Sequence, residues 1–258
     1  MNDLLKINSE QEKQKIVNFL KDTFQEQKID HAVIGLSGGI DSMTSFYLLK
    51  EVLPIENIHV AHLYYFNPNF SEIEKVLVNA KVPLDNIHNL SIKDSVDAVL
   101  KLQNTSFSEV EKVRAGNIMA RMRMIVLFDL SKKYNALVCG TENKTENLLS
   151  YFTRFGDQAS DIEPIEHLYK TQVFALAKYL GIPEIFITQK PSAGLWEGQT
   201  DEGQFGFSYE EADQVLFLAL EDNKSLKEIE EMGFKNVKKI LDWREKNLFK
   251  HQVPYTLE

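Results

Sequence analysis

Residues 37–42 read SGGIDS and combine two adjacent glycines with an aspartate and two hydroxyl side chains. The apolar run before them, HAVIGL, is typical of a buried strand, and DSMTSFYLLKEVL, which begins at Asp41, is typical of a helix. A strand, a glycine turn and a helix N-terminus together favour anion binding, because free backbone N–H groups and the positive helix end converge there. The stretch therefore predicts a phosphate loop.

This loop lacks the lysine of the common triphosphate-binding loop. The pattern G-x-x-x-x-G-K-[ST] has no match here, and the G-x-G-x-x-G spacing of dinucleotide-binding turns also fails. Glycines at 38 and 39 allow positive φ angles, so a phosphate can approach the backbone closely. Asp41 lies in the first helical turn, where it either caps the helix, as in a plain β–α turn, or holds a magnesium ion that bridges phosphates.

The elements around this loop predict the fold class. We expect apolar strands at 31–36, 58–65, 85–92 and 135–141, separated by helices that include a long one over 116–134. Such alternation indicates an α/β fold, a doubly wound parallel sheet flanked by helices. Ligands bind such sheets at the carboxyl ends of the strands, where both SGGIDS and GTENKTE (residues 140–146) lie.

Serine-to-glutamate pairs three residues apart predict the starts of two helices. Ser9 with Glu12, and Ser71 with Glu74, have the spacing of a capping box. The first helix should bury one apolar stripe, formed by Ile16, Val17, Phe19 and Leu20.

The organisation along the chain predicts a single domain over residues 1–258. We expect an N-terminal helix within 1–30, an α/β nucleotide-binding core over 31–190, and a substrate loop with C-terminal helices over 191–258. Long polar loops such as QKPSAGLWEGQTDEGQFGFS are typical of functional segments.

Composition excludes several classes of protein. The formal net charge of −9 and the pI near 5.3 argue against a nucleic-acid-binding protein, which carries a basic face. Cys139 is the single cysteine, so a disulfide framework is impossible, and we expect a buried, inert thiol in a reducing cytoplasm. The N-terminus has no signal pattern and no apolar run has membrane-spanning length, so we expect no membrane partner.

The stretch GLSGGIDS resembles the signature of the PP-loop ATP pyrophosphatases, which cleave ATP between the α and β phosphates. Five further stretches resemble, in order, blocks of the ammonia-dependent NAD synthetases: GNIMARMRM, GTENKTE, YFTRFGDQASDIEPI, LYKTQV and KPSAGLWEGQTDE. The resemblance runs from about Val33 to the C-terminus. It implies an adenine nucleotide alpha hydrolase-like fold and an enzyme that adenylates a carboxylate.

The resemblance also implies which residues handle ATP. Asp41 and Glu146 would hold Mg²⁺, and Lys170 would contact the ATP phosphates and supply the charge that the glycine loop lacks. These three are the candidate catalytic residues. Without the resemblance, Glu146 is interpreted as an acid favoured at a helix start, and Lys170 as a solvated helix residue. The ATP-binding set is Gly35, Leu36, Ser37, Gly38, Gly39, Ile40, Asp41, Ser42, Thr141, Lys170 and Ser192.

For the second substrate, deamido-NAD, the resemblance implies four contacts: Arg121, Arg154, Asp161 and Lys250. The chain departs from the family twice. GDQAS replaces a glycine-rich run after Arg154, and Phe249 occupies the place of a histidine that contacts substrate across a dimer interface. Arg123 points away from Arg121 on the same helix, and we interpret it as structural.

The implied reaction is ATP-dependent amidation of deamido-NAD by ammonia, through an adenylate, with release of AMP and pyrophosphate as the last step of NAD biosynthesis. Since 258 residues leave no room for a glutaminase domain, we expect free ammonia as the donor, and the resemblance adds a homodimer. Three alternatives stay open: amidation of nicotinate mononucleotide, another PP-loop ligase that modifies tRNA or forms GMP, and a non-catalytic nucleotide sensor.

Overall fold

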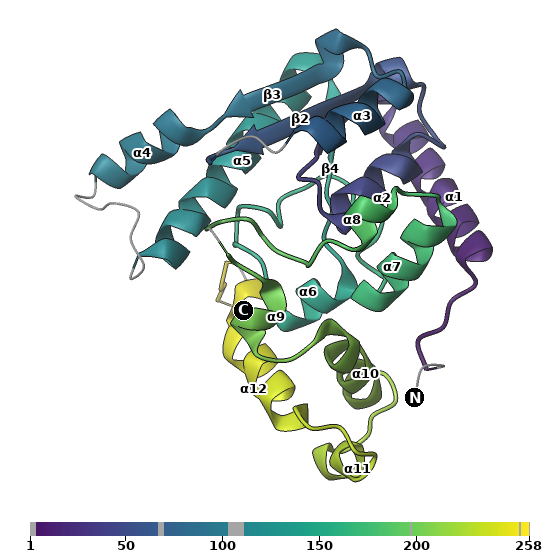
Figure 1. The fold of residues 1–258 in the computed structure, drawn as a ribbon, viewed down its shortest axis with the longest axis vertical. Coiled ribbons are helices and arrows are strands. Elements are labelled where there is room, and N and C mark those ends of the chain that lie inside the picture. The colour runs from purple at the N-terminus through teal and green to yellow at the C-terminus, as the bar shows by residue number, and fades with distance from the viewer. Residues whose placement is uncertain (1–3, 67–69, 103–110, 197, 253, 258) are drawn as a thin grey trace.

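The computed structural model describes residues 4–66, 70–102, 111–196, 198–252 and 254–257. A four-stranded sheet forms its centre (Figure 1), with β1 (His31–Gly35), β2 (Ile58–Tyr64), β3 (Ile87–Ser91) and β4 (Ala136–Cys139) in the order β3-β2-β1-β4. Each neighbouring pair is parallel, which confirms the predicted sheet. The chain order reverses between β1 and β4, and a ligand site is expected at their carboxyl ends.

Helices cover both faces of the sheet, so the doubly wound α/β fold is confirmed. Side chains from alternate positions of β1 point to opposite faces. Ala32 and Ile34 pack with α1 (Ser9–Gln27), α2 (Ile40–Leu49), α3 (Ser71–Asn79), α7 (Lys170–Tyr179) and α8 (Glu184–Ile187). Val33 packs with α4 (Lys93–Leu102) and α5 (Lys112–Tyr134). Short 3-10 turns, η1 (Ile55–Asn57) and η2 (Leu84–Asn86), lead into β2 and β3.

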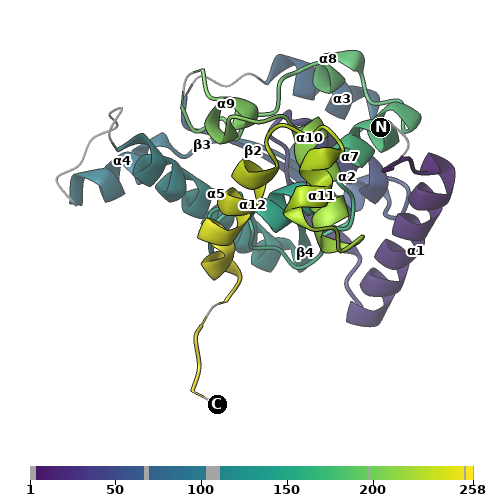
Figure 2. The same ribbon diagram turned by 90° about the horizontal axis from the view of Figure 1, so that it is seen from below.

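A second core joins the C-terminal helices to one helix of the α/β part. Its elements are α6 (Lys144–Leu149), α9 (Asp201–Phe205), α10 (Tyr209–Leu220), α11 (Leu226–Glu231) and α12 (Val237–Asn247). Aromatic rings fill it, with Phe205 against Tyr151, Tyr209 and Trp243. Figure 2 shows α10, α11 and α12 together and the chain beyond η3 (Leu248–His251) extending away from them. Among the described residues, no helix is long and apolar enough to cross a membrane.

The helix starts differ from the sequence prediction. Asn8 caps α1 by accepting a hydrogen bond from the backbone N–H of Gln11 at 3.1 Å, so Ser9 is already helical. No side chain caps α3, so neither expected capping box forms. Phe19 was expected in the core but is 46% exposed, because Ile16, Val17, Leu20 and Phe24 form the buried stripe and Phe19 falls outside it.

Candidate active site

The glycine loop joins β1 to α2 and presents an uncapped helix N-terminus. Of the two glycines that allow a positive φ, Gly38 uses it, with φ +86°, whereas Gly39 has φ −75°. Gly39 is the N-cap of α2, and no side chain among the described residues accepts from the first-turn N–H groups. The hydroxyls of Ser37 and Ser42 lie 3.2 Å apart beside it. This end of α2 therefore keeps its anion-binding capacity.

Lys170 is the centre of a buried charge cluster beside the loop. Its side chain is 2% exposed, and its Nζ lies 2.5 Å from Asp41 Oδ2 and 3.1 Å from Glu146 Oε1. Asn143 Nδ2 donates to the other oxygen of Asp41 at 3.0 Å. The carboxylate of Asp41 is thus engaged with Lys170 and Asn143, and it does not cap α2. The structure brings together the three residues predicted as catalytic.

A buried carboxylate from α10 holds the start of the lysine's helix. Asp213 has no exposed surface; its Oδ1 accepts from Thr145 Oγ1 at 2.5 Å and its Oδ2 from the Thr171 N–H at 2.8 Å. Thr145 Oγ1 in turn accepts from the Lys170 N–H at 2.9 Å. These bonds satisfy N–H groups in the first turn of α7 and so position Lys170.

Asp201 and Tyr209 complete the cluster, and sequence reasoning missed both. The hydroxyl of Tyr209 donates to Asp201 Oδ2 at 3.0 Å and lies 3.3 Å from Glu146 Oε1. Tyr151 donates to Asp201 Oδ1 at 3.1 Å. Asp201 belongs to the block KPSAGLWEGQTDE. It is also the first residue of α9, where an acid is common because it interacts favourably with the helix dipole, so its position alone did not single it out.

The charges in the cluster do not balance. Burial alone would lower the pKa of Lys170, but Asp41 and Glu146 raise it above its usual value, so this lysine is a fixed cation. Burial raises the pKa of Glu146 to about 7; Lys170 opposes that shift and Asp41 adds to it. Burial also raises the pKa of Asp201. The single ammonium group of Lys170 thus lies among three acids, Asp41, Glu146 and Asp201. This excess of acids favours binding of a further cation.

The donor set suits Mg²⁺. Two carboxylates, Asp41 and Glu146, converge on one position, where their oxygens meet the ammonium of Lys170. Among the described residues, no group of three or more His, Cys, Asp or Glu side chains could hold a metal. Mg²⁺ characteristically takes one or two carboxylates and completes its shell with phosphate oxygens and water. The residues present therefore fit a magnesium ion that is bound with a phosphate substrate.

Comparison with known proteins shows the family of this chain. The family model described as NAD synthase matches residues 12–254. The chain belongs to the NAD synthase family. A curated relative, the NH(3)-dependent NAD(+) synthetase of Fusobacterium nucleatum subsp. nucleatum, is 41% identical over 97% of this chain and 96% of its own length.

Solved structures of this family share the fold over nearly the whole chain. NMN synthetase from Francisella tularensis has a TM-score of 0.82 at 33% identity, covering 98% of this chain and all of its own. The NH3-dependent NAD synthetase from Campylobacter jejuni has a TM-score of 0.79 at 30% identity, with coverage of 98% and 100%. The fold predicted from the PP-loop resemblance is therefore confirmed.

A second group of predicted residues in this NAD synthase family member lies at the loop after α6. The Nε of Arg121 donates to the Arg154 carbonyl at 3.3 Å, and the guanidinium of Arg154 lies 5.9 Å from the ring centre of Phe249. Lys250 Nζ donates to the carbonyls of Ser150 and Phe152, each at 2.9 Å. Three of the four residues predicted for the dinucleotide thus meet at one loop, with Phe249 beside them.

The other predicted residues lie apart from these two groups. Asp161 is exposed, and its Oδ2 accepts from the Val138 N–H at 2.8 Å along the outer edge of β4, where Cys139 also pairs with Ile162. Ser192 is exposed and accepts from the Gly194 N–H at 3.1 Å. Thr141 is half-buried just beyond β4. Arg123, interpreted as structural, donates to the Leu63 carbonyl at the carboxyl end of β2 at 3.0 Å.

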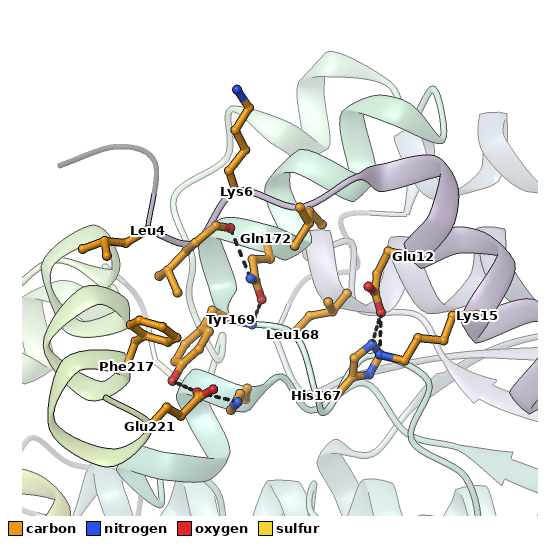
Figure 3. Close-up of a pocket in the computed structure, with 13 residues that line it drawn as sticks. Leu4, Lys6, Glu12, Lys15, His167, Leu168, Tyr169, Gln172, Phe217 and Glu221 are labelled. Atoms are coloured by element: carbon orange, nitrogen blue, oxygen red, sulfur yellow. Dashed lines mark hydrogen bonds and ion pairs between the residues drawn. The ribbon is translucent and has the colours of Figure 1, made fainter. Parts of the chain in front are cut away.

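A hollow of about 210 Å³ lies between the N-terminal segment, α7 and α10 (Figure 3). On one side Glu12 contacts Lys15 and His167, and on the other Tyr169 donates to Glu221 at 2.6 Å. None of its lining residues belongs to the predicted site. This hollow is therefore separate from the phosphate loop.

Proposed function

We propose that this protein converts deamido-NAD to NAD with ammonia as the nitrogen donor and ATP as the energy source. The observation that carries the proposal is the convergence of Asp41, Glu146 and Lys170 beside an uncapped phosphate loop, in a chain of the NAD synthase family. A carboxylate is a poor electrophile, because it is anionic and has no good leaving group. Adenylation removes both obstacles.

The reaction has two steps. The nicotinate carboxylate of deamido-NAD attacks the α-phosphorus of ATP, and pyrophosphate leaves. Ammonia then attacks the acyl carbon of the adenylate, AMP leaves with the electron pair of the broken C–O bond, and the attacking nitrogen loses one proton to give the neutral amide. Lys170 and the N–H groups at the start of α2 would stabilise the charge that develops on the departing pyrophosphate.

Asp41 and Glu146 would hold Mg²⁺, which when bound neutralises phosphate charge as a Lewis acid. For ATP we propose contacts from residues 35–42, Thr141, Lys170 and Ser192. For deamido-NAD we propose Arg121, Arg154, Asp161 and Lys250. The second set is supported by its three cationic residues, which meet at the loop after α6.

The decisive assay measures AMP and pyrophosphate from ATP and deamido-NAD, with ammonium and, separately, with glutamine as donor. We expect turnover with ammonium and little with glutamine. Absence of ammonium-dependent turnover would contradict the proposal. ATP binding without pyrophosphate release would favour a nucleotide sensor.

Amidation of nicotinate mononucleotide is the second candidate. It is favoured by the likeness to the Francisella tularensis NMN synthetase. The TM-score of that structure is 0.82, compared with 0.79 for the Campylobacter jejuni NAD synthetase. The chemistry is identical, so the ratio of kcat/KM for the two acceptors decides between them. A higher value for the dinucleotide is expected.

We also infer a homodimer built on α5. The run MIVLF at 124–128 is wholly apolar, yet none of its residues is buried in the single chain, and Ile125 is 52% exposed. A helix segment that is apolar all round is normally covered. The buried free thiol of Cys139 suits a reducing compartment, and we place the enzyme in the cytoplasm on that ground.

A further inference from the structure

Asn143 is a buried amide that contacts both of the acids proposed to hold Mg²⁺. Its side chain has no exposed surface, and it is the N-cap of α6. Its Oδ1 accepts from the Glu146 N–H at 3.0 Å, and its Nδ2 donates to Asp41 Oδ1 at 3.0 Å. One side chain thus connects the backbone of Glu146 with the carboxylate of Asp41, which lies 102 residues earlier in the chain.

The type of residue at this position follows from these two hydrogen bonds. Asn, Asp and Ser are all favourable N-caps, because each offers an oxygen to an N–H group in the first helical turn. Asp would place a second negative charge against Asp41, and Ser is one bond shorter and has no amide to reach it. The reversed amide is also unfavourable, because its oxygen would face a carboxylate. Of the three residue types, only asparagine satisfies both partners.

The main chain on both sides of Asn143 is held in place. The Glu142 N–H donates to Glu163 Oε2 at 3.0 Å, and the Lys144 N–H donates to the Leu168 carbonyl at 2.8 Å. The backbone is therefore fixed before and after the residue, and the side chain is closely packed. As a result, both ends of the amide keep fixed positions.

We propose that Asn143 is a positioning residue that sets the affinity of the site for Mg²⁺, because it holds Asp41 in a fixed relation to the start of α6. The assignment rests on the proposed function, in which Asp41 and Glu146 bind the ion. Each carboxylate oxygen has two lone pairs, so Asp41 Oδ1 can accept from the amide and still face a metal ion. Unlike Lys170, the amide is neutral and does not repel a cation. Groups that orient metal ligands typically contribute about 10- to 100-fold in metal affinity.

The first test measures Mn²⁺ binding by electron paramagnetic resonance, in the presence of a non-hydrolysable ATP analogue. Asn143→Ser keeps an acceptor for the Glu146 N–H but loses the bond to Asp41, so we expect the dissociation constant for Mn²⁺ to rise about 10- to 100-fold. Asn143→Thr also keeps a cap without an amide and should repeat the result. A dissociation constant equal to that of the wild type in both variants would overturn the proposal.

The matched control removes the same type of residue from another helix start. Asn8 is the N-cap of α1 and accepts from the Gln11 N–H at 3.1 Å, so Asn8→Ala loses a helix cap without touching the site. We expect this variant to bind Mn²⁺ like the wild type. Equal weakening of Mn²⁺ binding in Asn8→Ala and Asn143→Ser would contradict a positioning role, because any loss of a cap would then have the same effect.

The dependence of turnover on Mg²⁺ separates positioning from a merely structural role. In Asn143→Ser the apparent KM for Mg²⁺ should rise about 10- to 100-fold, whereas kcat at saturating Mg²⁺ and KM for ammonium should stay within about twofold of the wild type. Damage to the fold would lower kcat at every Mg²⁺ concentration. A loss of kcat that excess Mg²⁺ does not restore would therefore contradict the proposal.

The binding measurement needs neither ammonia nor deamido-NAD, so this proposal and the proposed function can fail separately. If the wild type binds Mn²⁺ with the ATP analogue but shows no ammonium-dependent turnover, the proposed function fails, and the comparison with Asn143→Ser still decides the role of the amide. If the wild type turns over and Asn143→Ser binds Mn²⁺ equally well, the positioning role is wrong while the function stands. Absence of Mn²⁺ binding by the wild type would overturn the role of Asn143 directly.

Discussion

At the scale of single residues, the behaviour of the site depends on how few cations balance its acids. Lys170 contacts two carboxylates directly, and Tyr209 links one of them to Asp201. We expect that removing a single charge here changes the electrostatic stabilisation of a leaving pyrophosphate more than it changes the fold, because the charged groups lie at the carboxyl ends of the strands and only Tyr209 of the cluster packs in an apolar core.

Asp41→Asn tests this directly. The amide keeps the shape of the side chain but loses the charge that attracts a metal ion and Lys170. We expect pyrophosphate release to fall about 10²- to 10³-fold, the usual effect of removing one transition-state contact, with Tm changed by only a few degrees. Turnover close to that of the wild type would exclude a metal-binding role for Asp41.

A second residue-scale feature is a stack of histidines at the amino-terminal ends of β1, β2 and β3, opposite to the ends that face the phosphate loop. The His59 ring lies 3.7 Å from that of Tyr134, between His31 at 5.6 Å and His88 at 6.0 Å, and neither ring nitrogen of His59 has a partner among the described residues. Burial, together with His31, His88 and Lys133, lowers the pKa of His59 to about 4 from 6.5.

This shift predicts acid lability. In the unfolded chain His59 takes up its proton near pH 6.5, but in the folded protein only near pH 4, so stability falls as the pH decreases through that window. The loss amounts to up to about 3 kcal/mol. Urea unfolding at pH 7 and pH 4.5 should show a smaller loss for His59→Phe than for the wild type, whereas the exposed His251→Phe should behave like the wild type. Equal losses in all three would count against the stack.

At the scale of elements, the contact of α10 with the start of α7 links the C-terminal helices to the chemistry. Asp213 acts through Thr145 and Thr171, and it touches no group that reacts. It is therefore a positioning residue. Its two hydrogen bonds fix the first turn of α7, from which the Lys170 side chain reaches the acids.

We expect Asp213→Ala to lower the free energy of unfolding by about 3 kcal/mol, because a buried hydroxyl and a buried N–H lose their acceptor. It should also lower kcat, with KM for ATP little changed, and Asp213→Asn should recover part of both losses. Asp242 forms an exposed pair with Lys238 at 2.6 Å, so Asp242→Ala should change stability by at most about 0.5 kcal/mol. Similar effects of the two alanine variants would contradict a positioning role.

Elements were more predictable than contacts between them. Apolar periodicity was sufficient for the strands and most helices, since it reports burial on one face or both. Helix starts were predicted less well, because Asn8 and Ser9 both suit an N-cap and packing decides between them. The pair formed by Lys170 and Asp41 spans 129 residues, so no spacing rule could find it, and only the family resemblance placed Lys170 near ATP.

The residues that were missed had ambiguous local signals. Asp201 lies at a helix start, where an acid is common, and Asp213 lies inside a helix, where a single acid is usually solvated. Asn143 stands within a recognised block, but burial of its side chain is a tertiary property that sequence spacing does not report.

At the scale of the whole molecule, the apolar run on α5 predicts association. We expect Ile125→Glu to convert a dimer to a monomer in sedimentation or light-scattering measurements, because a charge would be buried without a partner in the interface. Val78 on α3 is similarly exposed, at 61% against 52% for Ile125, so Val78→Glu is the matched control and should leave the assembly intact. A wild type that is monomeric at micromolar concentration would contradict the dimer.

The hydrogen bonds that complete the site join residues that are synthesised at different times. The glycine loop is synthesised early. The hydrogen bond of Thr145 to Asp213 requires a residue made 68 positions later, and that of Lys250 to the Ser150 carbonyl requires one made 100 positions later. A chain that ended before α10 would therefore lack the bonds that hold the site, although it would contain every strand of the sheet.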